Sequence, residues 1–106
     1  SYVKNIGIII NNKRVRSVKT LDKLNQLAKE NSLDLFIIQN EFVDLIDSTL
    51  LTIDEFKSQV EIVIALGGDG TVLFSAAKLI GTNIPILDDT IINLKKYGQL
   101  VQFIQI

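Results

Sequence analysis

The sequence of 106 residues predicts an α/β domain with three layers, in which helices cover both faces of a mainly parallel sheet. Strand-like apolar runs alternate with segments whose apolar residues recur at helical spacing, which is the order of βαβ units. The runs have almost no polar alternation, as expected for parallel strands that are covered on both faces. A glycine-rich turn at residues 66–71 joins one of these runs to the helical segment after it.

The first strand is predicted over residues 2–10, because residues 6–10 form a nearly continuous β-branched run. We expect this strand to lie in the centre of the sheet. A polar loop at residues 11–16 follows, and Ser17 is suited to be the N-cap of the next helix. The face of that helix that packs on the sheet is predicted to contain Val18, Leu21, Leu24, Leu27 and Ala28.

A second strand is predicted over residues 34–39, and the chain is acidic and apolar by turns over residues 40–60. Thr52 and Glu55 have the spacing of a capping box, which predicts a short helix that runs to Val60. The acidic residues are interpreted as a solvated helix face, with a metal cluster as the alternative. These residues are Glu41, Asp44, Asp47, Asp54 and Glu55.

The third strand is predicted over residues 61–66, directly before the glycine turn. The helix after the turn has Lys78 in its last turn and should end at Gly81. A fourth strand over residues 84–87 should lie at an edge of the sheet, since Pro85 cannot donate a ladder hydrogen bond. The buried residues of the helix are predicted to be Leu73, Ala76, Ala77 and Ile80.

The tail has a different pattern from the rest of the chain. Residues 90–94 and 99–106 form two strand-like runs around a polar stretch, which is typical of a hairpin rather than of a sheet built by crossovers. We therefore predict one α/β domain over residues 1–87 and a separate tail over residues 88–106. One interpretation is that this tail is a returning segment of a larger protein.

Composition excludes several classes of function. The chain contains no cysteine and no histidine, which excludes disulfides, Cys/His zinc sites and any nucleophile activated by histidine. A net charge of −1 gives no reason to expect binding to nucleic acid or to an anionic membrane. No long apolar run or signal segment is present in the sequence, so we expect a soluble, cytoplasmic protein.

The glycine turn is the strongest candidate for a binding site. Gly67, Gly68 and Gly70 allow close approach of a ligand to the backbone, and the N–H groups at a helix start favour anions such as phosphate. Asp69 would repel a phosphate unless a metal ion or a substrate hydroxyl lay between them, which indicates phosphoryl transfer. The alternative is a structural turn in which Asp69 only caps the helix. Thr71 could cap the helix, bind phosphate or do both.

The end of the first strand offers further candidates. Asn11 and Asn12 follow that strand, and ligands of open α/β sheets bind beyond the carboxyl ends of the strands. Arg14 lies among cations before a helix, where positive charge is mildly unfavourable unless an anion binds there. A solvated loop is the alternative for this cationic stretch.

The stretch from Leu66 to Leu73 resembles the NAD kinase family. The sequence GGDGT is shared by NAD kinases and by the diacylglycerol and sphingosine kinases, with a close variant in phosphofructokinases. The two alanines at 76–77 and the Ile-Pro-Ile-Leu of residues 84–87 are similar to the NAD kinase pattern, and the Pro-x-Gly-Thr-x-Asn stretch of lipid kinases is not found. One departure is that Asp88 and Asp89 stand where the family continues toward Gly-x-Asn and a second, β-rich domain.

The resemblance implies a Rossmann-like domain that uses ATP to phosphorylate the 2′-hydroxyl of the adenosine ribose of NAD, giving NADP. It implies that Gly67, Gly68 and Gly70 hold phosphates and that Asp69 accepts the hydroxyl proton or holds magnesium or another divalent cation. NAD and ATP would be the partners of a homo-oligomeric full-length enzyme, and this chain alone would be inactive. The alternatives are a lipid or sugar kinase, or a nucleotide-binding module without turnover.

Overall fold

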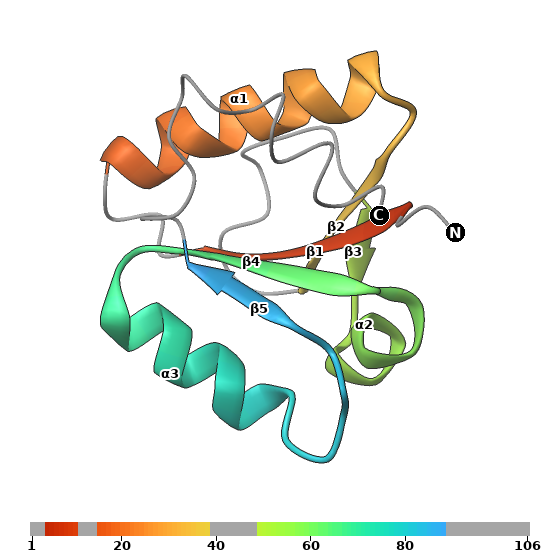
Figure 1. Cartoon of the computed structure of the whole chain (residues 1–106), viewed down its shortest axis with the longest axis vertical. Coiled ribbons are helices and arrows are strands. Elements are labelled where there is room, and N and C mark those ends of the chain that lie inside the picture. Colours follow the sequence, from red (N-terminus) through yellow and green to blue (C-terminus); the bar gives the residue numbers. More distant parts are fainter. Residues whose placement is uncertain (1–3, 11–14, 39–48, 89–106) are drawn as a thin grey trace.

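The computed structural model describes residues 4–10, 15–38 and 49–88. Strands and helices alternate along most of this part of the chain (Figure 1). In order, the elements are β1 (Asn5–Ile10), α1 (Val15–Glu30), β2 (Asp34–Ile38), β3 (Thr49–Leu51), α2 (Ile53–Gln59), β4 (Ile62–Leu66), α3 (Asp69–Lys78) and β5 (Ile86–Asp88).

Within the described residues, five strands form one sheet in the order β3-β2-β1-β4-β5, and every pairing is parallel. The predicted α/β class is confirmed. Ile8 in β1 pairs with Ile37 on one side and Ile64 on the other, which confirms its central position. β5 is an edge strand of this sheet, as Pro85 predicts, and the Pro85 carbonyl accepts a hydrogen bond of 2.9 Å from the N–H of Val63.

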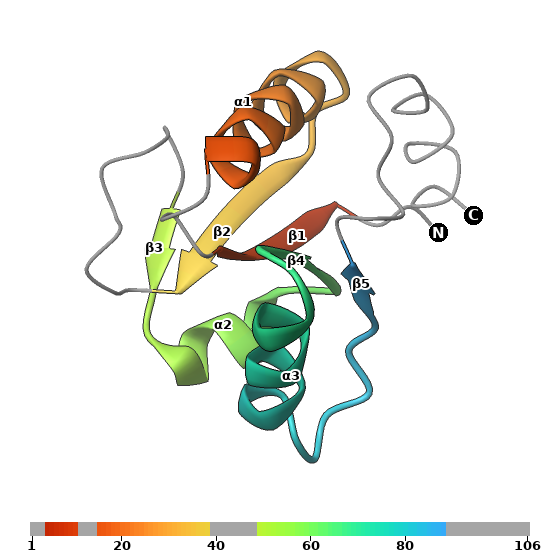
Figure 2. The ribbon, with the colours of Figure 1, turned by 90° about the vertical axis from the view of Figure 1, so that its left-hand side faces the viewer.

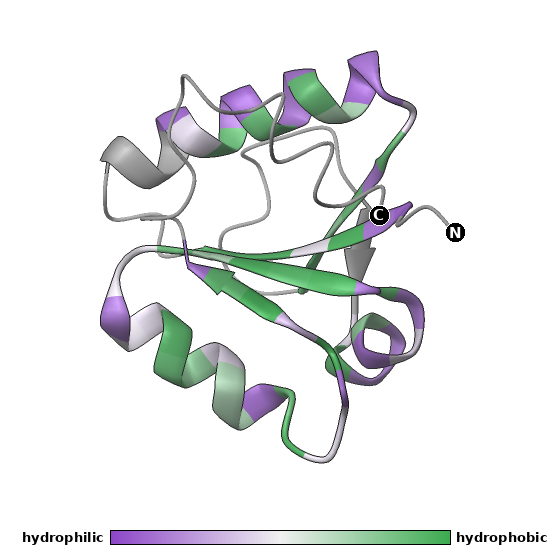
Figure 3. Cartoon of the chain, viewed as in Figure 1, coloured by the Kyte–Doolittle hydropathy of each residue, from purple (hydrophilic) through white to green (hydrophobic). Residues whose placement is uncertain are grey.

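Helices cover both faces of the sheet, which gives the predicted three layers (Figures 1 and 2). α1 lies on one face, where Leu21, Leu24 and Ala28 belong to a buried cluster with alternate residues of β1, β2 and β4. α2 and α3 lie on the other face, where Phe56 and Leu79 belong to a second cluster. The strands β1, β2, β4 and β5 are mainly hydrophobic, whereas the coloured part of α1 alternates between hydrophobic and hydrophilic residues (Figure 3).

Gly7 allows α2 to pack closely on the sheet. A Cβ atom at this position would lie 2.4 Å from Cζ of Phe56, which is closer than atoms can approach without displacement. Phe56 has no exposed surface, so its ring has little room to move. The glycine within the β-branched run of β1 therefore has a structural role that the sequence pattern does not reveal.

The helix α2 begins with the predicted capping box. The N–H of Glu55 donates to Oγ1 of Thr52 at 3.3 Å, and the N–H of Thr52 donates to Oε1 of Glu55 at 3.2 Å. The Thr52 hydroxyl also donates to the Glu55 carboxylate at 2.8 Å. This hydroxyl, followed by the Thr52 backbone N–H, lowers the pKa of Glu55 below its ordinary value of 4.5.

Several boundaries differ from the sequence prediction. α1 begins at Val15, so Ser17 lies inside its first turn and is not the N-cap. The three-residue strand β3 was not predicted, because it is too short to show a periodic pattern. β5 runs over Ile86–Asp88, whereas the fourth strand was predicted over residues 84–87. The predicted hairpin at 90–94 and 99–106 lies outside the described residues.

The predicted buried face of α3 is wrong. Leu73 and Ile80 are 71% and 78% exposed, and Ala76 and Ala77 are also exposed. The buried residues are instead Thr71, Ser75 and Leu79, which recur every four residues along one side of the helix. Burial of Ser75 is possible because its hydroxyl donates to the Thr71 carbonyl at 2.7 Å.

Candidate functional site

The glycine turn lies at the carboxyl edge of the sheet, directly after β4. Leu66 ends this strand and pairs with Ile10, the last residue of β1, so the two central strands end side by side. Gly67 has φ 143° and Gly68 has φ 96°. L side chains rarely adopt these φ values, and the turn therefore needs glycine at both positions.

The first turn of α3 is open toward this edge. Gly68 is the N-cap, and its carbonyl accepts hydrogen bonds from the N–H groups of Thr71 at 3.1 Å and Val72 at 3.2 Å. No side chain caps the helix. In the described part of the chain, no acceptor is found for the N–H groups of Asp69 and Gly70. N–H groups of this kind at a helix start favour an anionic ligand.

Asp69 places a carboxylate beside these N–H groups. It is the first residue of α3 and is exposed. No hydrogen bond or ion pair joins its carboxylate to another described residue. Its contribution to the helix is therefore the favourable charge at the helix start, and its oxygens can contact a ligand.

Gly70 has no structural reason to be glycine in the described chain. A Cβ atom there would have no neighbour within 4 Å, and no positive φ requires glycine. Alanine would favour the helix by up to about 1 kcal/mol relative to glycine. The missing side chain leaves the backbone accessible at the helix start, which is what binding of a phosphate at close range requires.

The remaining predicted site residues fall into two groups. Thr71 is the third residue of α3 and is 9% exposed, so it does not cap the helix and belongs mainly to the packed side. Asn11, Asn12 and Arg14 lie outside the described residues. The structure therefore brings together Gly67, Gly68, Asp69 and Gly70 at one edge of the sheet.

The donor set at this edge fits a magnesium ion that is held mainly by a substrate. Mg²⁺ prefers oxygen ligands and is commonly bound through one or two carboxylates together with substrate phosphates. Asp69 supplies one exposed carboxylate, next to N–H groups that favour phosphate. Among the described residues, no group of three or more metal-ligating side chains occurs, so the metal cluster that was the alternative interpretation of the acidic residues is not found there. Glu41, Asp44 and Asp47 lie outside these residues.

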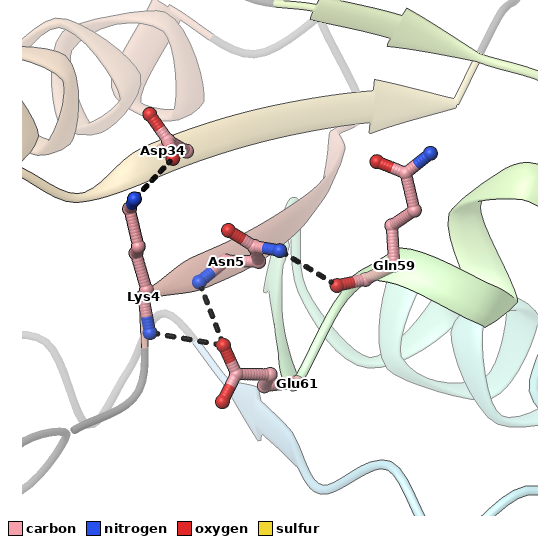
Figure 4. A network of polar contacts seen from close by, with 5 residues as sticks. All are labelled: Lys4, Asn5, Asp34, Gln59 and Glu61. Atoms are coloured by element: carbon pink, nitrogen blue, oxygen red, sulfur yellow. Dashed lines mark hydrogen bonds and ion pairs between the residues drawn. The ribbon is translucent and has the colours of Figure 1, made fainter. Parts of the chain in front are cut away.

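The opposite, amino edge of the sheet is closed by polar contacts (Figure 4). The Glu61 carboxylate accepts hydrogen bonds of 3.0 Å from the N–H groups of Lys4 and Asn5. The Asn5 amide donates to the Gln59 carbonyl at 3.1 Å, and the Lys4 ammonium lies 3.9 Å from the Asp34 carboxylate. Here the backbone groups at the strand starts are satisfied by side chains, which indicates a structural role.

Comparison with known proteins agrees with this arrangement. The family model of the ATP-NAD kinase N-terminal domain matches residues 6–88, which include nearly all of the described sheet and the glycine turn. The chain belongs to the NAD kinase family. It is 29% identical over 102 residues to an NAD kinase of Natranaerobius thermophilus, which covers 94% of this chain and 34% of that protein. It is also 29% identical over 101 residues to an NAD kinase of Chloroherpeton thalassium, covering 92% and 32% respectively.

The chain thus spans about a third of the length of these two curated relatives. Among its described helices, none is both long and apolar enough to cross a lipid bilayer.

Proposed function

We propose that this chain is the nucleotide-binding domain of an enzyme that transfers the γ-phosphoryl group of ATP to the 2′-hydroxyl of the adenosine ribose of NAD. The products would be NADP and ADP. The observation that carries the proposal is the exposed Asp69 carboxylate beside the open N–H groups at the start of α3. Membership of the NAD kinase family supports the choice of ATP as donor and NAD as acceptor.

Backbone groups of the turn would hold the phosphates. The N–H groups of Asp69 and Gly70 would donate to phosphate oxygens, and Gly67 and Gly68 would give the backbone the shape that lets the ligand approach. The positive end of the α3 dipole adds to this attraction. Phosphoryl transfer depends mostly on positioning and on neutralisation of charge, which these groups can provide.

Asp69 would orient the attacking hydroxyl. In the proposed step, the ribose oxygen forms a bond to the γ-phosphorus, the bond from that phosphorus to the bridging oxygen breaks, and ADP leaves. The hydroxyl proton passes to the Asp69 carboxylate. Because a carboxylate is a weak base for a sugar hydroxyl, its main contribution would be orientation of that hydroxyl.

Asp69 is also the residue that would hold a divalent cation. Magnesium, when bound, would neutralise the charge of the triphosphate. Of the four residues at the edge, Asp69 alone has a carboxylate, so one side chain would have to serve the cation and the hydroxyl.

The proposal is tested by incubating the full-length enzyme, meaning this chain joined to the remainder that its relatives carry, with NAD, ATP and magnesium. We expect NADP to form in proportion to enzyme. A lipid or sugar kinase would instead transfer label from ATP to diacylglycerol, sphingosine or a sugar phosphate. Label transfer to one of these acceptors without NADP would contradict the proposal. Light scattering of the same preparation would test whether the enzyme is a homo-oligomer, as we expect.

A second function, nucleotide binding without turnover, is favoured for this chain alone by its length, which is about a third of that of its relatives. We expect a preparation shown by mass to contain only this chain to bind ATP and to form no NADP. Sustained NADP formation by that preparation would show that the chain is a complete kinase.

A further inference from the structure

The side of α3 that faces away from the sheet is apolar. Leu73 is 71% exposed, and Ala76 and Ala77 on the same side of the helix are exposed as well. Ile80 continues this spacing just beyond the end of the helix and is 78% exposed. These four residues, none of which is charged, are called the outer face of α3.

The side of α3 that packs on the sheet is less apolar than the outer face. It consists of Thr71, Ser75 and Leu79, of which only Leu79 belongs to a hydrophobic cluster. A surface helix usually has its apolar side toward the core and its polar side toward solvent, whereas a helix with apolar residues all round is buried. The pattern of α3 is therefore that of a helix that is covered on both sides.

The border of the outer face is polar, which is typical of a contact surface. Lys78 places its ammonium group 5.3 Å from the centroid of the Phe74 ring, and that ring is 51% exposed. Protein interfaces have few charged residues at their centre and polar groups at their rim. The small side chains of Ala76 and Ala77 would let the backbone of a partner approach closely.

The area of this surface distinguishes between possible partners. Taking about 150 to 200 Å² for each large side chain when fully exposed, Leu73, Phe74 and Ile80 expose roughly 350 Å². A stable interface between separate proteins buries about 800 Å² on each partner. The surface is thus too small to hold a second copy of the chain firmly. A covalently joined segment needs less area, because its effective concentration reaches the order of millimolar.

The two curated relatives contain such a segment, since about two thirds of their length lies outside the part that this chain matches. The last described strand, β5, borders β4, and Ile86 of β5 packs in the same cluster as Leu79 of α3. The chain therefore leaves the described part beside α3. We propose that an apolar surface of the remainder of the full-length enzyme packs on the outer face of α3. This inference rests on the proposed function only in that it requires such a remainder.

Thiol labelling tests the proposal, because this chain contains no cysteine. Leu73→Cys and Ile80→Cys are made separately, in this chain and in the full-length enzyme, and their reaction with a maleimide is timed. In the chain alone, both should react as fast as Lys29→Cys, an exposed position in α1 on the other face of the sheet (Figure 2). In the full-length enzyme, both should react at least about tenfold more slowly than in the chain. The unsubstituted full-length enzyme gives the background from its own cysteines.

A charged variant provides a second measurement that needs no cysteine. Ala77→Glu should melt within about 2 °C of wild type in the chain alone, because position 77 is exposed there. In the full-length enzyme, it should lower the melting temperature by about 3 °C or more, because the charge would be buried without a partner. Ala77→Gln is the matched neutral control and should cause a smaller loss.

Two results would overturn the proposal. Equal labelling rates in the chain and in the full-length enzyme would show that the outer face stays open. Slow labelling in the chain alone that depends on its concentration would show that a second copy covers the face. Neither measurement requires turnover, so a full-length enzyme that protects both positions but forms no NADP would contradict the proposed function and not this inference.

Discussion

The helices α2 and α3 begin in opposite ways, although each has an acidic residue in its first turn. At the start of α2, the Thr52 side chain caps the helix and the Glu55 carboxylate accepts a hydrogen bond from the Thr52 N–H. At the start of α3, the N-cap is Gly68 and no side chain caps the helix. Since orphan N–H groups are commonly satisfied by a capping side chain, the difference supports our proposal that a ligand binds at the start of α3.

The same contrast holds between two glycines. Gly7 is glycine because the ring of Phe56 fills the space where a Cβ would lie. Gly70 has open space at that position and a backbone that other residues could adopt. Packing in the core therefore accounts for glycine at position 7. No packing contact accounts for glycine at position 70, which lies beside the open N–H groups of α3 and is therefore a candidate for a role in binding.

The largest effect is expected at Asp69. In the full-length enzyme, Asp69→Asn keeps the size of the side chain but removes its charge, and we expect turnover to fall by ~10² or more, the scale of losing a general base. Affinity for ATP should change much less. Steady-state NADP formation at saturating NAD, ATP and magnesium measures the loss, with Asp34→Asn as the control. If turnover stayed within threefold of wild type, the only remaining role of Asp69 would be its favourable negative charge at the start of α3.

The glycine contrast predicts two opposite stability changes. Gly7→Ala should destabilise the fold by about 1 to 3 kcal/mol, because the added methyl overpacks the site beneath Phe56.

Gly70→Ala should stabilise the fold by up to about 1 kcal/mol through helix propensity, while weakening ATP binding. Urea denaturation and calorimetry measure both changes. If Gly70→Ala binds ATP as wild type does, the backbone at position 70 is not approached by the ligand.

Removing the side-chain cap of α2 should have a smaller effect on stability. Thr52→Ala removes the capping side chain and should lower the free energy of unfolding by about 1 kcal/mol, whereas Thr52→Ser should retain most of it. ATP affinity should be unchanged in both variants. A loss of ATP affinity in folded Thr52→Ala would show that the two helix starts are not independent.

The pH dependence of stability tests the same capping box. The pKa of Glu55 is lowered in the folded state, so its contribution to stability is present above its ordinary value of 4.5 and is lost as pH falls through the folded pKa. Glu55→Gln should therefore be less stable than wild type at pH 7, and the difference should shrink below pH 4.5. Melting temperatures from pH 7 to pH 3 measure it. A difference that stays constant down to pH 3 would contradict the lowered pKa.

Much of this contrast could be predicted from the sequence, because it depends on local signals. The capping box needs two residues at a fixed spacing, and the glycine turn needs glycines between a strand and a helix. The longer strands are recognisable because burial on both faces leaves continuous apolar runs. These features form in the structure at or close to the predicted positions.

Other features depend on contacts between residues that are distant in the sequence, and local patterns do not predict these contacts. Apolar residues occur on all sides of α3, so periodicity could not show that the side containing Ser75 faces the sheet. Gly7 must be glycine because of Phe56, which is distant from it along the chain. The position of Asp88 beside Ala65 likewise follows from strand order, which no local pattern encodes.

The central claim is that nucleotide binds at the open start of α3 and not at the closed start of α2. Titration of the isotopically labelled chain with ATP and magnesium, followed by amide NMR shifts, tests it directly. We predict the largest shifts at the N–H groups of Asp69 and Gly70, with little change at Glu55 and Phe56. Saturable binding with its largest shifts at the start of α2, or along the amino edge around Lys4 and Asn5, would contradict the account.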